Sequence, residues 1–362
     1  MFLTRLIAPV LCAAALAAPA SADAKKIYPY KVVVLGAGSG SYGSAINHRG
    51  HIAGRLIPGS GDHAFLYANG VLTDLGSLPG NDGSQANGIN NRGQIVGNTF
   101  GLNQPSRAFL YSGGVMRDIG SLAGGVTAAS DINDAGDIVG NSVLQVHYPF
   151  AYIYRNGLMR NLGSLPGSDR SVAAAINNRG VIAGSSGVGP SQGPNGNQSH
   201  AVIWKNGHIR DLGTLGGLNS YGHDINELGQ VTGYSSYAGG DYPNDEYGGF
   251  IWTNGRMRDI GAPAGGNQVQ PQAINNLGQV VGIYNRGGQQ RAFVYGYLGG
   301  IHDLGALVDP AQGWWIMAAH DINDRGQITG MACDPAQHCS AVRLDPWYKP
   351  AAAAAASSGA PN

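Results

Sequence analysis

Charge is scarce in this chain. Lys, Arg, Asp and Glu make up 12% of the 362 residues, against the ~25% that is usual for soluble proteins. The 22 basic residues balance the 22 acidic ones, so the formal net charge at pH 7 is zero. Because nucleic-acid binding needs a dense field of Lys and Arg, this composition argues against a nucleic-acid partner.

The short motifs of common catalytic sites are also missing. The chain has neither a Gly-x-Ser-x-Gly elbow nor a His-Glu-x-x-His motif. The glycine-rich run 36–40 follows a predicted strand, but a further β pattern comes after it. A phosphate-binding loop needs a helix N-terminus at that point, so this run is not interpreted as a nucleotide site.

Long apolar runs are confined to the N-terminus. Residues 1–24 combine Arg5, the apolar stretch 6–18 and small residues suited to cleavage at 20–24. This pattern is typical of a secretory signal peptide, and it predicts a secreted or periplasmic protein. No second apolar run follows, so we expect no membrane-spanning anchor.

Cysteine is nearly absent. One of the three cysteines lies in the signal peptide, which leaves Cys333 and Cys339. An even pair in an exported chain predicts a disulfide. The alternative is a metal site formed by these two residues and His338, for which the sequence offers no convincing fourth ligand.

What the chain has in abundance is repetition. One short motif recurs seven times, at intervals of 43–49 residues. It consists of a small or acidic residue, then Ile-Asn, two variable residues and Gly. A period in this range with strand-like content is the signature of a repeat fold. The Ile-Asn pairs lie at 46–47, 89–90, 132–133, 176–177, 225–226, 274–275 and 322–323.

Each repeat is predicted to form a four-stranded antiparallel meander. In the second copy the strands are expected at 86–90, 94–97, 107–111 and 115–120. In four other copies the last two strands are joined by Asn-Gly, the strongest short-range hairpin signal. These pairs are Asn69-Gly70, Asn156-Gly157, Asn206-Gly207 and Asn254-Gly255.

The two ends of the repeat array complement each other. The last copy stops after its third strand, whereas an additional strand at 31–36 precedes the first copy. If this strand completes the last repeat, the ring closes and exposed sheet edges stay short. We therefore predict an all-β, seven-bladed propeller at 25–348, followed by a disordered Ala/Ser/Pro tail at 349–362. The protein is expected to be a monomer.

Three recurring sequence features resemble the HAF-family extracellular repeats of bacteria. They are the third strands His63-Ala64-Phe65-Leu66-Tyr67 and 200–204, the Asp-Leu-Gly-Ser-Leu-Pro-Gly run at 74–80 and the Ile-Asn-Asn-Arg-Gly runs. The similarity covers roughly residues 30–345. It implies an extracellular or surface-exposed repeat protein and brings no catalytic residues. The His that opens two third strands is replaced in the other five, so we do not expect a ring of identical ligands.

Residues present in every copy are expected to serve the scaffold. The Asn of Ile-Asn is predicted to bond its own turn. The Asp of Asp-Leu-Gly becomes Asn161 in one copy, which indicates that this position needs a hydrogen bond and not a charge.

Function is expected where the repeat is broken. The loop between the second and third strands of the fifth copy is long and combines Tyr with carboxylates, which suits sugars or a calcium ion. The connector 306–319 carries two adjacent Trp residues. The predicted ligand-binding residues are Tyr234, Tyr237, Asp241, Tyr242, Asp245, Glu246, Tyr247, Trp314, Trp315 and His320.

A second candidate lies on the predicted ring axis. The residue before Ile-Asn is acidic in three copies, at Asp131, Asp224 and Asp321, and His223 and His320 precede two of these. They are expected either to face a channel as a cation or acid–base site or to bond the backbone of the neighbouring blade.

Three functions remain open from the sequence. The first is a non-catalytic propeller that binds glycan or protein through the loops of one face. The second is a carbohydrate-active hydrolase or lyase, which needs two acids about 5–10 Å apart. The third is a structural surface repeat. No cofactor is expected apart from a structural calcium ion.

Overall fold

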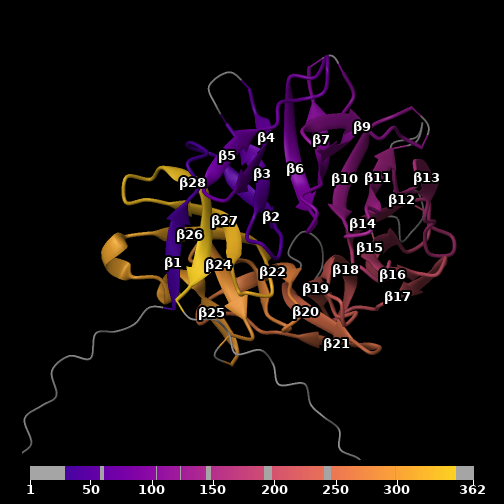
Figure 1. Ribbon diagram of the computed structural model, residues 1–362. Helices are drawn as coiled ribbons and strands as arrows, with labels where there is room; N and C mark the ends of the chain where they lie inside the picture. The colour runs from indigo at the N-terminus through magenta and orange to yellow at the C-terminus, as the bar shows by residue number, and fades with distance from the viewer. Residues whose placement is uncertain are drawn as a thin grey trace, which may run out of the picture.

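Seven four-stranded antiparallel sheets form a ring (Figure 1). The computed structural model describes residues 29–57, 61–102, 104–122, 124–143, 148–190, 198–239, 246–297 and 299–347. The predicted seven-bladed propeller is confirmed. The predicted signal peptide at 1–24 and the tail at 349–362 lie outside the described residues.

Blades 1 to 6 take their strands in chain order from the axis outward, and blade 7 adds β1 as its outermost strand. Blade 1 comprises β2 (Tyr42–Ile46), β3 (Ile52–Leu56), β4 (His63–Ala68) and β5 (Val71–Asp74). Blade 2 comprises β6 (Gly83–Ile89), β7 (Ile95–Phe100), β8 (Ala108–Ser112) and β9 (Val115–Asp118). Blade 3 comprises β10 (Thr127–Ile132), β11 (Ile138–Val143), β12 (Pro149–Arg155) and β13 (Leu158–Asn161). Blade 4 comprises β14 (Ser171–Ile176), β15 (Ile182–Gly187), β16 (Ser199–Lys205) and β17 (His208–Asp211).

The remaining blades follow the same plan. Blade 5 comprises β18 (Gly216–Ile225), β19 (Val231–Tyr237), β20 (Tyr247–Thr253) and β21 (Arg256–Asp259). Blade 6 comprises β22 (Asn267–Ile274), β23 (Val280–Arg286), β24 (Gln289–Tyr295) and β25 (Ile301–Asp303). Two 3₁₀ turns, η1 (Leu304–Leu307) and η2 (Pro310–Gln312), lead to blade 7, which comprises β26 (Trp315–Ile322), β27 (Ile328–Cys333), β28 (Cys339–Pro346) and β1 (Tyr30–Val34).

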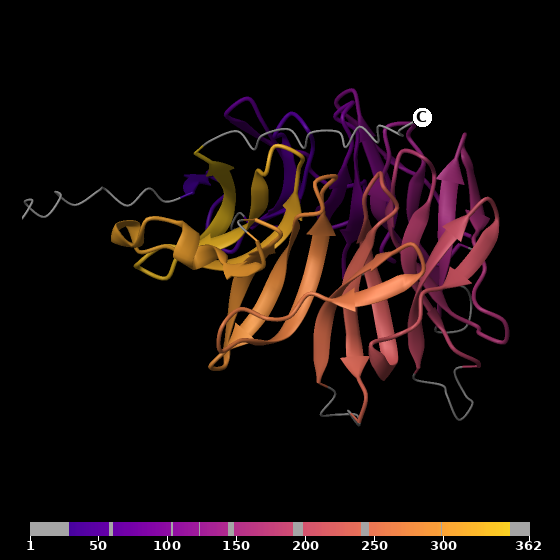
Figure 2. The same ribbon diagram turned by 90° about the horizontal axis from the view of Figure 1, so that it is seen from below.

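The meander gives the ring two different faces, and Figure 2 shows the strands running between them. The tight turns that follow the first strands of all blades and the third strands of blades 1 to 6 lie on one face, here called the turn face. The loops that follow the second strands, and the connectors between blades, lie on the other, here called the loop face. The Ile-Asn motifs belong to the turn face, because each one ends a first strand.

The N-terminal strand closes the ring, as predicted. β1 pairs antiparallel with β28, and Val32, Val33 and Val34 lie opposite Leu344, Arg343 and Val342. Leu35 N–H continues the ladder by donating to the Ala341 carbonyl at 3.1 Å. Blade 7 is thereby completed by the two ends of the described chain.

Local chemistry sets the shape of each blade. The predicted Asn-Gly turns have positive φ at both residues, for example 54° at Asn69 and 82° at Gly70, as a type I′ hairpin requires. First strands carry a bulge just before Ile-Asn, and each second strand places a glycine against the bulge. At Gly97 a Cβ would overlap the backbone of Gln85, so larger residues are excluded at this position.

The Asp-Leu-Gly motif anchors the outer strand, as the hydrogen-bond prediction required. Asp118 accepts from Gly120 N–H at 2.8 Å, and Asn161 accepts in the same way from Gly163 at 2.7 Å. The second carboxylate oxygen of Asp118 pairs with Arg107, which opens the third strand. Where Asn161 replaces Asp, the basic residue is absent as well. The ion pair is therefore an addition to the shared hydrogen bond.

The predicted disulfide is present. Cys333 ends β27, Cys339 begins β28, and the two residues are register partners joined through their sulfur atoms. The alternative metal site at these residues is wrong, because bridged sulfurs are no longer thiolate ligands. His338 instead lies 3.5 Å from Asp334.

Candidate functional site

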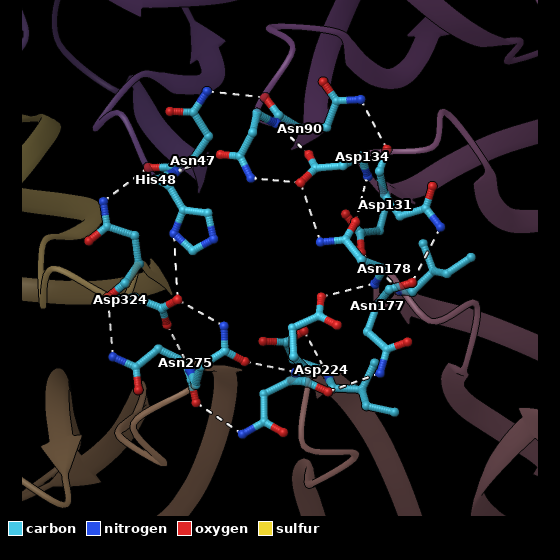
Figure 3. Close-up of a pocket in the computed structure, with 18 of the residues that line it drawn as sticks. Asn47, His48, Asn90, Asp131, Asp134, Asn177, Asn178, Asp224, Asn275 and Asp324 are labelled. Carbon is cyan, nitrogen blue, oxygen red and sulfur yellow. Dashed lines mark hydrogen bonds and ion pairs between the residues drawn. The ribbon is translucent and has the colours of Figure 1, made fainter. Parts of the chain in front are cut away.

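The seven asparagines of Ile-Asn form a closed ring around the axis on the turn face (Figure 3). Each Nδ2 donates to the backbone carbonyl of the equivalent Asn in the next blade, at 3.0–3.3 Å. Within its own turn, Asn177 Oδ1 also accepts from Arg179 and Val181 N–H. The predicted bond to the local turn is confirmed, and the sequence had given no indication of the bond between blades.

The residues that follow these asparagines in the sequence form a second, more exposed ring, here called the outer ring. In six of the seven contacts of this ring, a side-chain oxygen of one member accepts a hydrogen bond from the backbone N–H of the member in the preceding blade. These distances are 2.7–3.0 Å. At the seventh, His48 Nδ1 lies 3.6 Å from Asp324 Oδ2. The ring members are His48, Asn91, Asp134, Asn178, Glu227, Asn276 and Asp324.

The three predicted axial carboxylates lie just beneath these rings. Each accepts at Oδ1 from the N–H of the next residue, at 2.7 Å. Each also accepts at Oδ2 from the equivalent Ile of the following blade, at 2.7–2.9 Å. One carboxylate thus serves two blades, so Asp residues in blades 3, 5 and 7 satisfy six of the seven Ile N–H groups. The expectation that they bond the neighbouring backbone is confirmed.

The pKa values of the three axial carboxyl groups lie above the ordinary value for Asp. Burial raises the pKa of Asp131, raises that of Asp224 to about 7 and raises that of Asp321 to about 8. The backbone hydrogen bonds act in the opposite direction, because they stabilise the charged carboxylate. The mutual repulsion of Asp224 and Asp321 adds to the upward shift of the pKa of Asp321.

The cavity at this mouth is small and polar. It encloses about 170 Å³ and is lined by the two asparagine-rich rings together with Asp131 and Asp224. In the described residues, no group of three or more His, Cys, Asp or Glu side chains could hold a metal ion. The lining groups are largely bonded to one another, so the mouth acts first as a hydrogen-bonded closure of the ring.

The two histidines near the axis also join blades. His223 Nδ1 lies 2.8 Å from the Pro271 carbonyl, and His320 Nδ1 lies 2.8 Å from the Gly43 carbonyl. Burial lowers the pKa of both imidazoles. A neutral imidazole that donates to a carbonyl accounts for both positions, and neither is needed as a proton donor to a ligand.

The fifth blade differs from the expected long loop. Tyr234 and Tyr237 lie in β19 and Tyr247 begins β20, so the prediction that these are loop residues is wrong. The strands extend because ladder bonds and ring packing hold them: Tyr234 lies 5.2 Å from Tyr247, between ring centroids. Tyr237 donates to Asp259 at 2.7 Å. The predicted sugar and calcium ligands Asp241, Tyr242 and Asp245 lie outside the described residues.

The structure does not bring all the predicted ligand-binding residues together. Tyr237, Glu246 and Tyr247 line a cleft between blades 5 and 6. Trp314 and Trp315 line a different cleft, between blades 6 and 7. Trp315 also begins β26 on the loop face whereas Asp321 is near its far end, about 20 Å away along an extended strand.

The tryptophan cleft combines aromatic, basic and acidic side chains on the loop face. It encloses about 370 Å³ and is lined by Arg291, Asp303, Gly305, Ala306, Trp314, Trp315 and Ile316. Trp314 packs against the core, and Trp315 Nε1 donates to the Gln290 carbonyl at 3.2 Å. Arg291 Nη1 lies 3.5 Å from Asp303 Oδ2. The Nε atom of Arg291 is buried and has no hydrogen-bond partner among the described residues.

Comparison with solved structures supports the fold. The β-propeller domain of the trilobed protease from Pyrococcus furiosus aligns with a TM-score of 0.57 and 13% identity, over 84% of this chain and 95% of that domain. A puromycin-hydrolysing peptidase from Mycobacterium tuberculosis aligns with a TM-score of 0.56 and 13% identity, over 87% of this chain. The chain spans about half (53%) of that peptidase. At these identities the likeness defines the class of protein, a β-propeller, and no activity.

No protein-family model and no curated protein sequence matches this chain. The resemblance to HAF-family repeats therefore stays a prediction from the motifs.

Proposed function

We propose that the protein is an exported, non-catalytic propeller that binds a saccharide in the tryptophan cleft of the loop face. The observation that carries this proposal is the arrangement of Trp315 and Arg291. The Trp315 ring is fixed through its own N–H, and the neighbouring guanidinium retains an unpaired donor.

This combination suits a pyranose ring. Its apolar C–H face packs on an indole, while guanidinium and carboxylate groups bond its hydroxyls. Arg291 lies 3.5 Å from Asp303, so the guanidinium can exchange this loose contact for a hydroxyl group. Asp303 is itself held in place, because its two oxygens accept from Tyr284 OH at 2.8 Å and from Gly305 N–H at 2.7 Å. The volume of about 370 Å³ accommodates a monosaccharide unit of a longer chain.

Binding is favoured over hydrolysis by the acids that line the cleft. A glycosidase of the common type places two carboxyl groups across the scissile bond. Among the described residues lining this cleft, Asp303 alone carries a carboxyl group.

Export is supported by one further observation. The Cys333–Cys339 bridge is of a kind that persists in oxidising compartments. Within the described part of the chain, no helix is long and apolar enough to cross a membrane.

The test is a glycan-array screen followed by calorimetry on the Trp315→Ala variant. We expect at least a tenfold loss of affinity with little change in melting temperature, since Trp315 is partly exposed. Trp347→Ala is the matched control, because Trp347 is 64% exposed and does not line the cleft. Unchanged binding by Trp315→Ala, or an equal loss in both variants, would contradict the proposal.

A further inference from the structure

A second groove lies on the opposite side of the molecule, between blades 3 and 4. It encloses about 340 Å³ at the turn-face end of the blade interface. Blade 3 contributes residues of β12 and β13, and blade 4 contributes both of its turns with parts of β15 and β16. None of these residues belongs to the tryptophan cleft or to the asparagine ring.

The groove is strongly basic although the chain as a whole is neutral. Arg155, Arg160, Arg179 and Lys205 all line it. Arg155 is neutralised, because its Nε and Nη2 atoms contact the Asp137 carboxylate at 2.7 and 2.6 Å. That contact keeps the pKa of Asp137 below its usual value. No ion pair involves the other three side chains within the described residues, and all three are exposed.

A buried donor lies in the floor of the groove. Trp204 is 2% exposed, and its indole Nε1 has no hydrogen-bond partner in the described part of the chain. An unsatisfied buried N–H is energetically unfavourable. An acceptor atom brought into the groove would offer the partner that Trp204 lacks.

The repeat does not produce this combination by itself. In the equivalent groove one blade earlier, between blades 2 and 3, Arg117 occupies the position of Arg160. There Ala135 stands in place of Arg179, and the neutralised Arg155 stands in place of Lys205. One blade later, Leu228 replaces Arg179, and Arg210 stacks over Trp252 at 5.1 Å from the ring centroid. Unpaired cations therefore gather between blades 3 and 4 beyond what their repeat positions require.

We propose that this groove binds a tetrahedral oxyanion, a sulfate group carried as an ester on an acidic saccharide. Guanidinium groups match the oxygens of such a group in paired hydrogen bonds, which gives geometric specificity as well as charge. The volume of about 340 Å³ exceeds what one free ion fills, which favours an oxyanion borne on a larger molecule. This site is independent of the tryptophan cleft.

The test measures binding by calorimetry at fixed ionic strength, with three probes: a sulfated oligosaccharide, the same oligosaccharide without sulfate, and inorganic sulfate. Binding of the sulfated probe together with inorganic sulfate shows that the oxyanion suffices. Binding of the sulfated probe alone shows that the saccharide is needed as well. Equal binding of the desulfated probe, or no binding of either sulfate-bearing probe, would overturn the proposal.

Variants locate the site. The double variant Arg160→Gln and Arg179→Gln is expected to lose at least tenfold in affinity, since both side chains are exposed and unpaired. Trp204→Phe keeps a ring and removes the N–H, and a loss of severalfold is expected. Arg117→Gln is the matched control from the preceding blade and should bind normally. If it weakens binding as much as the double variant does, the attraction is diffuse and the site does not exist.

Discussion

Replacing Asn177 with Ala tests whether the asparagine ring holds neighbouring blades together. The side chain is 4% exposed and makes three hydrogen bonds, one to the Asn226 carbonyl of the next blade and two within its own turn. At about 1 kcal/mol for each bond, the free energy of unfolding should fall by about 3 kcal/mol. Urea unfolding followed by far-UV circular dichroism measures this change.

The adjacent residue supplies the control. Asn178 is exposed, and its side chain contacts Asp134 across the blade interface in the outer ring. Because water can replace these contacts, Asn178→Ala should reduce the free energy of unfolding by about 1 kcal/mol or less. An Asn177→Ala variant that is no less stable than Asn178→Ala would refute the role given to the ring.

A substitution by Asp separates the two functions of Asn177. The carboxylate of Asn177→Asp still accepts the two bonds of the turn, but it places an oxygen where Nδ2 donates to the Asn226 carbonyl at 3.0 Å. We expect a loss of stability at neutral pH that diminishes at acid pH, where a protonated carboxyl group can donate again. The comparison is with the unsubstituted protein at the same pH, and a deficit in the free energy of unfolding that is equal at both pH values would show that the bond between blades is unimportant.

Two further predictions concern closure and pH. Deleting residues 25–36 removes β1 and exposes the β28 edge, so the variant should unfold or oligomerise. Size-exclusion chromatography measures its oligomeric state and thermal unfolding its melting temperature. A monomeric variant with an unchanged melting temperature would contradict closure by β1. Folding raises the pKa of Asp224 to about 7 and that of Asp321 to about 8. Between about pH 4 and 8 the folded state therefore holds protons that the unfolded state has released. The free energy of unfolding should fall as pH rises through this window and level off above it. Urea unfolding at pH 5, 7 and 9 measures the slope, which should be shallower in Asp321→Asn; a slope that this substitution leaves unchanged would assign the pH dependence to other groups.

The fold was predictable because the chain repeats itself. Each copy contains the turn residues that a meander needs, and Asn69-Gly70 has the positive φ angles that its sequence implies. Closure was predictable as well, since the strand missing from blade 7 matched the spare strand at the N-terminus. The disulfide followed from two cysteines left in a chain predicted to be exported.

The sites were less predictable because they depend on contacts between repeats. The sequence placed Tyr234 in a loop, whereas packing against Tyr247 keeps it within a strand. The grouping of Trp315 with His320 as ligand-binding residues also failed, since the extended strand β26 separates residues that are close in sequence. Trp314 and Trp315 line a cleft where the irregular connector had suggested a site, and Tyr237, Glu246 and Tyr247 line a separate one.

The sequence by itself determined the number of blades, their strand order and the residues each turn requires, because these depend on interactions within some 45 residues that recur along the chain. The tertiary structure alone decided which side chains meet across blades. Asn177 reaches the carbonyl of Asn226, and one carboxylate such as Asp131 serves two Ile N–H groups, because curvature brings equivalent turns together at the axis. The same apposition brings Arg160, Arg179 and Trp204 into one groove, from positions whose distance in the sequence gives no sign of contact.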